Sequence, residues 1–285
     1  MTLCTSGCGS EIPINVRICP ACGMDNACPN VRAASQPAEV DALDHRYSEA
    51  LNRAAQRGTR AIVLDFQAAV DQSVAVNALS LDEAERILKA SNKLFQTFAA
   101  RISAGSQSPC TTDYYDMVRP RVEALLFPYY GQEIRFAALS LTYDGLTSFG
   151  PIALILSEQA IACRSTVLED NSVHFFQDHK TDLLADFPPG YRATWSRRGM
   201  LAVAKLADQI SGPLDRRGYH NLLLHHDATT GREHCIEVHI FGACNLHTVN
   251  IVRGPKRFRR NADQVRWNDL QYRAHSHGLT VELTP

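Results

Sequence analysis

The chain has 285 residues, a formal net charge of −1, 45% hydrophobic residues and 21% charged residues. This length allows a small N-terminal module plus one large or two medium domains, and the composition is ordinary for a globular protein. The balanced charge argues against a whole-protein nucleic-acid or membrane binder, and no run approaches the roughly 20 apolar residues of a membrane-spanning helix.

The first cysteines of the chain have the spacing of a zinc ribbon. They follow the pattern C-x3-C-x10-C-x2-C, and a glycine follows each pair. Paired thiolates in tight turns are typical ligands of structural zinc, and the glycine tolerates the positive φ that the turn requires. The alternating apolar residues between the pairs predict one short hairpin. We therefore predict a ribbon over residues 1–28 around one zinc ion, with these ligands: Cys4, Cys8, Cys19 and Cys22.

The alternative for these cysteines is a set of disulfides or free thiols. The opening Met-Thr-Leu-Cys has neither the basic nor the apolar region of a secretory signal, so we expect a reducing, cytoplasmic compartment. Cys28 lies six residues past the last ligand and is expected to be a spare thiol. Four further cysteines are scattered without a pairing pattern: Cys110, Cys163, Cys235 and Cys244.

Helices dominate the expected structure after the ribbon. Ser80 and Glu83 form a capping box ahead of apolar residues at the helical period. Residues 29–40 are rich in Pro, Ala and polar residues and are expected to be a linker. The elements expected next are a helix over 41–57, a buried strand over 61–65, a helix over 80–102, a loop over 103–111 and a helix over 119–127.

The signal then changes to strands. The expected strands are Ile134–Leu141, Pro151–Ser157, Ser172–Phe176, Tyr219–His225, His234–Phe241 and His247–Val252. A helix is expected over 197–211, and Thr229-Thr-Gly231 is expected to be a hairpin turn. We therefore predict an α+β domain over residues 41–285, with a helical part at about 41–130 and a mixed β-sheet over 131–285.

One strand carries ionisable residues inside an apolar run. In His234–Gly242, alternation places Ile236, Val238 and Ile240 on a core face and Glu237 and His239 on the opposite face. Two interpretations are open. The opposite face is exposed to water, or it is a cleft floor on which Glu237 and His239 meet a ligand.

Short pieces of the chain resemble a group of uncharacterised bacterial proteins that are similar to the ADP-ribosyltransferase fold. The pieces are Arg135-Phe-Ala-Ala-Leu-Ser-Leu, Asp144-Gly, Phe149-Gly, Arg164-Ser-Thr, Asn171-Ser and Cys235-Ile-Glu-Val-His-Ile-Phe-Gly, about a third of the chain. The family pattern has an Arg on an early strand, a Ser/Thr cluster on a middle strand and a Glu-x-Glu or Gln-x-Glu on a late strand. This sequence departs from it at the last step, where Glu237-x-His239 stands.

The resemblance implies transfer of ADP-ribose from NAD to a macromolecular acceptor, protein or nucleic acid. Glu237 and His239 would be catalytic, with Glu237 stabilising an oxocarbenium-like transition state. The implied NAD-binding residues supply a guanidinium for phosphate and hydroxyls for ribose: Arg135, Arg164, Ser165 and Thr166. The alternatives are a surface salt bridge for Arg164 and ordinary strand-surface roles for the two hydroxyl residues.

Histidines gather in the same region. They are His220, His225, His226, His234, His239 and His247, with Asp227 nearby. Such a set suits the metal site of a hydrolase, although no recognised metal-binding spacing is present. The alternative is that these side chains are hydrogen-bonded or exposed.

A basic cluster follows the last expected strand. The segment Arg253-Gly-Pro-Lys-Arg-Phe-Arg-Arg260 has five basic residues in eight, with an interleaved aromatic residue. Cations and aromatic rings suit phosphate backbones and bases, so we expect nucleic-acid contacts from Lys256, Arg257, Arg259 and Arg260. The alternative is a solvated loop. The first hypothesis from the sequence is therefore an ADP-ribosyltransferase targeted by its ribbon. The alternative is a non-catalytic zinc-ribbon adaptor that binds nucleic acid or protein, and the third hypothesis is a metal-dependent hydrolase; the oligomeric state stays open.

Overall fold

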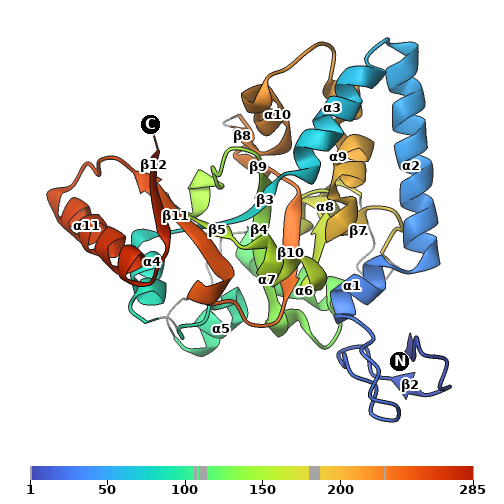
Figure 1. Cartoon of the computed structure of the whole chain (residues 1–285), viewed down its shortest axis with the longest axis horizontal. Coiled ribbons are helices and arrows are strands. Elements are labelled where there is room, and N and C mark those ends of the chain that lie inside the picture. Colours follow the sequence, from blue (N-terminus) through green and yellow to red (C-terminus); the bar gives the residue numbers. More distant parts are fainter. Residues whose placement is uncertain are drawn as a thin grey trace.

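The computed structural model describes residues 2–90, 92–105, 108, 114–179, 187–227 and 229–284. It is a mixed α/β structure with one large mixed sheet and an N-terminal cysteine cluster consistent with a zinc ribbon (Figure 1). The predicted α+β class is confirmed. In the described part of the chain, no helix has the length and apolarity needed to cross a membrane.

The ribbon is built from two short turns. Strands β1 (Thr2–Leu3) and β2 (Glu11–Ile12) pair around the first turn, and an isolated bridge joins Ile18 to Asp25 around the second. The expected single hairpin between the cysteine pairs is therefore wrong. Each cysteine pair instead lies inside its own turn, and Gly9 and Gly23 have the expected positive φ, 76° and 73°.

The segment expected to be a linker, residues 29–40, is mostly helical. Helix α1 (Pro29–Ala34) follows the ribbon directly, and α2 (Pro37–Gln56) begins three residues after α1 ends. A proline in the first turn of each helix suits its fixed φ. The composition was misleading here because prolines that begin helices resemble prolines that prevent them. The domain boundary near residue 28 stays a prediction.

The helical region differs from expectation in two places. Residues 61–65 lie in α3 (Arg60–Asp71) and not in a strand, because Val63, Phe66 and Val70 recur at helical spacing and are fully buried. The predicted Ser80 cap of α4 (Leu81–Leu88) is confirmed, since its Oγ accepts from the Glu83 N–H. The single helix expected over 80–102 is instead two helices, because α4 ends at Leu88 and α5 (Phe98–Ser103) begins ten residues later. Helix α6 (Tyr114–Leu126) contains Pro120.

The sheet has the strand order β12-β11-β5-β3-β4-β10-β6-β7 and is antiparallel except between β11 and β12. The predicted strands over 134–141, 151–157, 234–241 and 247–252 are confirmed with shifted ends. Strand β3, which lies in the region expected to be helical, is at the centre of the sheet. The strands are β3 (Val74–Leu79), β4 (Ile134–Ser140), β5 (Ile152–Leu156), β6 (Ser165–Leu168), β7 (Arg192–Thr194), β10 (Glu237–Phe241), β11 (Val249–Pro255) and β12 (Thr280–Thr284).

Two expected strands are helices. Residues 172–176 lie in α8 (Ser172–Asp178), whose first amides donate to the Asn171 side chain, and residues 219–225 lie mostly in α10 (Arg216–Leu223), capped by Asp215. Asx caps favour helices over strands because they satisfy the free N–H groups of the first turn. The remaining elements are α7 (Glu158–Ile161), α9 (Arg198–Leu206), α11 (Asn261–Ser276) and the hairpin of β8 (His225–Asp227) and β9 (Arg232–His234), which contains the predicted turn.

The two faces of the sheet are covered differently. One face forms the main core with α2, α3, α4, α9 and α11, through residues such as Leu139, Val238 and Trp267. The other face carries a second core, in which α6 and α8 cover β4, β10 and β6 through Leu126 and Phe175. The ribbon lies at one end of the molecule and α11 at the other (Figure 1).

Candidate functional site: the cysteine cluster, the buried dyad and the basic segment

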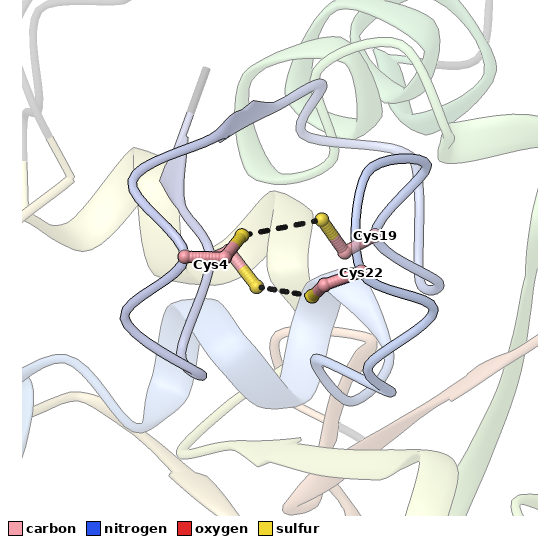
Figure 2. Close-up of side chains that lie close together, drawn as sticks. Cys4, Cys19 and Cys22 are labelled. Carbon is pink, nitrogen blue, oxygen red and sulfur yellow. Dashed lines mark hydrogen bonds between the residues drawn. The ribbon is translucent and has the colours of Figure 1, made fainter.

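The four predicted zinc ligands converge. Their sulfur atoms all lie within 4.8 Å of one another, and the Cys4–Cys22 and Cys8–Cys19 sulfur distances are 3.6 and 3.8 Å. Figure 2 shows Cys4 facing Cys19 and Cys22 across the ribbon. A zinc ion with bonds of about 2.3 Å to four sulfurs separates them by about 3.8 Å in a tetrahedron. The four residues therefore fit a zinc ion, with sulfur shifts of at most about 1 Å.

The ribbon has little else to hold it together. Its core consists of Cys4, Ile12 and Cys19, with Val16 packed against them. Hydrogen bonding to Ser10 lowers the pKa of Cys8 to about 6. A backbone hydrogen bond from Cys22 lowers the pKa of Cys19, but burial and the neighbouring thiols of Cys22 and Cys4 together outweigh it and raise this pKa to about 11, so the thiolate that a metal requires forms at Cys8 before it forms at Cys19. So small a core stabilises a fold only with a cross-link, and a bound ion supplies one.

The other cysteines do not join this cluster. Cys28 is buried immediately before α1, Cys235 and Cys244 are buried, and Cys163 is exposed. All the described cysteines are free thiols, whereas Cys110 lies outside the described residues. The prediction that Cys28 is a spare thiol agrees with its place outside the described metal cluster.

Helix α1 fastens the ribbon to the sheet. The buried Arg32 donates to the Ile14 and Val16 carbonyls at 2.6 and 3.1 Å, and it reaches the Asn26 carbonyl at 3.5 Å. On the opposite side of the helix, the buried Asn30 donates to the carbonyls of His239 and Arg164 at 2.9 and 3.0 Å. Sequence reasoning missed both residues. The available signal was two polar side chains two positions apart, eight and ten residues past the last ligand, Cys22.

Glu237 and His239 form a buried dyad on β10. His239 Nε2 lies 2.8 Å from Glu237 Oε2, and the two residues are 3% and 7% exposed, in that order. The same carboxylate accepts from the Ser172 backbone N–H at 3.1 Å and from the Asn171 side chain at 3.4 Å, both at the start of α8. The predicted alternation is confirmed. The face that carries the dyad is neither exposed to water nor the floor of a cleft, because α6 and α8 cover it.

The surroundings of the dyad are aromatic and charged. The rings of Phe127 and Phe136 meet the His239 ring edge-on, with centroids 4.8 and 5.3 Å away. Glu123 on α6 is buried nearby and pairs with Arg119 at 2.6 Å. Burial raises the pKa of Glu123, and the negative charge of Glu237 adds to this rise. In the sequence, Glu123 could be noticed only because it follows Arg119 by four positions, the spacing of an ion pair along a helix.

The residues implied as the NAD site are not brought to one face. Residues opposite each other in an antiparallel pair share a face. Arg135 and Ser165 both lie opposite Ile240, on the main-core face, whereas Thr166 lies opposite His239 on the dyad face. The thickness of the sheet therefore separates Arg135 and Ser165 from the Glu237–His239 dyad.

Three of these residues already donate hydrogen bonds to backbone carbonyls. Arg164 donates to the carbonyls of Ala160 and Phe241 at 2.9 and 2.6 Å, and Ser165 donates to Ile161 at 2.8 Å. Arg135 donates to the carbonyls of Phe95 and Gln132. The guanidinium groups of Arg135 and Arg164 therefore already donate to the protein, although recognition of the NAD phosphates would need their N–H groups.

The histidines are not assembled into a metal site. His225 and His234 stack on the hairpin with centroids 4.7 Å apart, His226 pairs with Glu233, and His220 lies in α10. Among the described residues, the cysteine cluster is the set whose ligand atoms converge for a metal.

The basic segment is exposed. Lys256, Arg257, Arg259 and Arg260 all lie at the surface between β11 and α11, and the described residues provide none of them with an ion pair. The interleaved Phe258 is different, because it packs toward Trp267 with ring centroids 6.3 Å apart. Base stacking by Phe258 is therefore disfavoured, and phosphate contacts stay available to the four cations.

Comparison with known proteins adds no relative. No model of a protein family matches the chain, and no curated protein matches it at a significant level. These comparisons therefore give no support to the resemblance to the ADP-ribosyltransferase fold.

Proposed function

We propose that the protein is a zinc-ribbon adaptor that binds the phosphate backbone of nucleic acid through residues 256–260. The observation that carries this proposal is the exposure of four cations within five residues, without a described carboxylate partner, in a chain of net charge −1. Local positive charge without stacking aromatic side chains favours sequence-independent phosphate contacts.

The ribbon has a different role in this proposal. Its Arg17 is paired with Asp25, so it offers no free cation to phosphate, whereas Ile18 and Met24 are 49% and 47% exposed. The ribbon and the segment before α11 lie at opposite ends of the molecule (Figure 1). A partner on the ribbon and a nucleic acid on the basic segment would not compete for space, as an adaptor requires.

The test is a salt titration of binding to a fluorescent single-stranded oligonucleotide. Four phosphate contacts predict a logarithmic slope near 3, since each contact on a single strand contributes about 0.7. The triple variant Lys256→Gln/Arg257→Gln/Arg259→Gln should reduce this slope by about 2. A matched control removes three exposed cations elsewhere: Arg60, Lys93 and Arg121. Equal loss in both variants, or no binding at about 50 mM salt, would refute the proposal.

A second candidate is transfer of ADP-ribose from NAD, with Glu237 as the catalytic carboxylate. Its support is the set of donors around that carboxylate, His239, Ser172 and Asn171, which hold the charge in one orientation. A substrate would reach it only after α6 moved, since Glu237 is 7% exposed. Release of nicotinamide that falls by roughly 10²–10³ in Glu237→Gln would support this candidate. A wild-type protein that releases none would end it.

A further inference from the structure

A cavity lies away from the ribbon and the dyad. Its volume is about 400 Å³, which is within the range of small-molecule sites. Its floor is formed by β3, β5 and β11, and its walls by the loop after β4 and by α10. Its polar lining residues come from the loop after β4, from α10, from β11 and from β12, and they include Tyr143, Asp144, Arg217, His220, Arg253 and Thr284.

The polar groups of this cavity converge on Asp144. Its carboxylate accepts from the Thr142 hydroxyl at 2.8 Å and lies 3.2 Å from both Arg217 and Arg253. His220 Nε2 lies 4.0 Å away. Two guanidinium groups therefore surround one carboxylate, and the cavity has an excess of positive charge.

His220 adds a neutral donor. Its Nδ1 accepts from the Leu141 backbone N–H at 3.4 Å, so the ring hydrogen lies on Nε2, toward Asp144. Burial lowers the pKa of His220, and the opposing effect of Asp144 is smaller. The excess positive charge therefore comes from the arginines.

The two arginines differ in how firmly they are held. The Arg253 side chain is 11% exposed and also donates to the Thr142 carbonyl, while its Nε has no partner among the described residues. The Arg217 side chain is 66% exposed, and Asp144 is its one hydrogen-bonding or ion-pair partner among the described residues. Arg253 is thus a fixed cation in the wall, and Arg217 can turn toward a ligand at the rim.

The wall of the cavity is held against the sheet. Tyr143 has a φ of 67°, which is uncommon for a bulky residue. Gly145 and Gly150 approach β3 so closely that a Cβ would lie 2.9 Å from the Ala78 Cβ and 2.0 Å from the Leu79 carbonyl oxygen, respectively. The cavity therefore exists before a ligand binds, which limits the entropy lost on binding.

We propose that this cavity binds a phosphate monoester with a hydroxyl-bearing organic part, of the nucleotide class. Arg217 binds the phosphate, the fixed positive charge of Arg253 stabilises it from the wall, and Asp144 accepts a hydrogen bond from a ligand hydroxyl. The floor at Ala78 and Ala153 contacts the organic part. This inference is independent of phosphate-backbone binding by residues 256–260.

The experiment is isothermal titration calorimetry on the full chain with AMP, adenosine and inorganic phosphate. AMP should bind more tightly than either fragment, because only AMP uses both halves of the site. Arg217→Gln should weaken AMP about tenfold, the usual effect of losing one charge-assisted bond. Arg217 is exposed, so this variant should fold. Arg121→Gln, another exposed arginine, is the matched control and should leave AMP binding unchanged.

A 5′-phosphorylated oligonucleotide and its unphosphorylated form identify the source of the phosphate. This comparison uses the triple variant Lys256→Gln/Arg257→Gln/Arg259→Gln, in which contacts to the nucleic-acid phosphate backbone are weakened. Preference for the phosphorylated end over AMP supports a nucleic-acid terminus as the ligand, and preference for AMP supports a free nucleotide. Absence of AMP binding at millimolar concentration, or an unchanged affinity in both Arg217→Gln and Asp144→Asn, would overturn the proposal.

Discussion

The buried Arg32 should link zinc binding to the α/β domain. Replacing it by methionine retains most of its length and removes the donors to the Ile14 and Val16 carbonyls. The third contact, to the Asn26 carbonyl at 3.5 Å, is at the limit of a hydrogen bond and is expected to contribute little.

The magnitude follows from the two short bonds. A hydrogen bond from a charged donor contributes about 1.5–3 kcal/mol, so two contribute about 3–6 kcal/mol. Burial lowers the pKa of Arg32, which shows that the charged form is desolvated, and removing that charge recovers part of the loss. We therefore expect Arg32→Met to weaken docking of the ribbon by about 3 kcal/mol.

Zinc affinity measures this loss. If only the zinc-bound ribbon docks, the docking free energy adds to the zinc-binding free energy, so a loss of about 3 kcal/mol weakens zinc roughly a hundredfold. Competition with a chromophoric chelator measures the affinity. Arg17→Met is the matched control, because Arg17 is an exposed ribbon arginine paired with Asp25. Equal zinc affinity in wild-type and Arg32→Met proteins would refute this reasoning.

Three further predictions concern the α/β domain. Glu237→Gln should lower the free energy of unfolding by about 1–3 kcal/mol in urea titrations, because His239 and a backbone N–H lose a charged acceptor; an unchanged midpoint would contradict this. Burial lowers the pKa of His174 to about 4, below its unfolded value, so stability should fall by roughly 3 kcal/mol as the pH drops from about 6.5 to about 4. His174→Phe should abolish this part of the pH dependence, and an unchanged pH profile would refute its assignment. Gly150→Ala should prevent stable folding, because its Cβ would lie 2.0 Å from a carbonyl oxygen, whereas Gly231→Ala, with nothing within 4 Å, should cost only about 1 kcal/mol in thermal unfolding.

The sequence by itself was sufficient where the chemistry is local. Two cysteine pairs with following glycines predict a metal site, because each pair needs only its own turn to present two sulfurs. The strands over 134–141 and 151–157 and the Ser80 cap were also predictable, since continuous apolar runs and capping residues act within a few positions.

The sequence was insufficient where a short segment suits two structures. Residues 61–65, 172–176 and 219–225 are apolar or mixed runs of five to seven residues, short enough for a strand or a helix turn. Helical packing of Phe66 and the caps at Asn171 and Asp215 decided the outcome. Strand β3 escaped prediction because its place at the centre of the sheet depends on partners about 60 and 80 residues away along the chain.

The sites depend most on tertiary structure. Alternation correctly placed Glu237 and His239 on one face, but α6 and α8 decide that this face is buried, and strand register decides that Arg135 and Ser165 lie on the other. The polar residues of the cavity around Asp144 come from four distant parts of the chain. The sequence lists the charged side chains. Long-range strand pairing and helix packing determine which of these side chains are buried side by side, where the low dielectric strengthens the interaction between their charges.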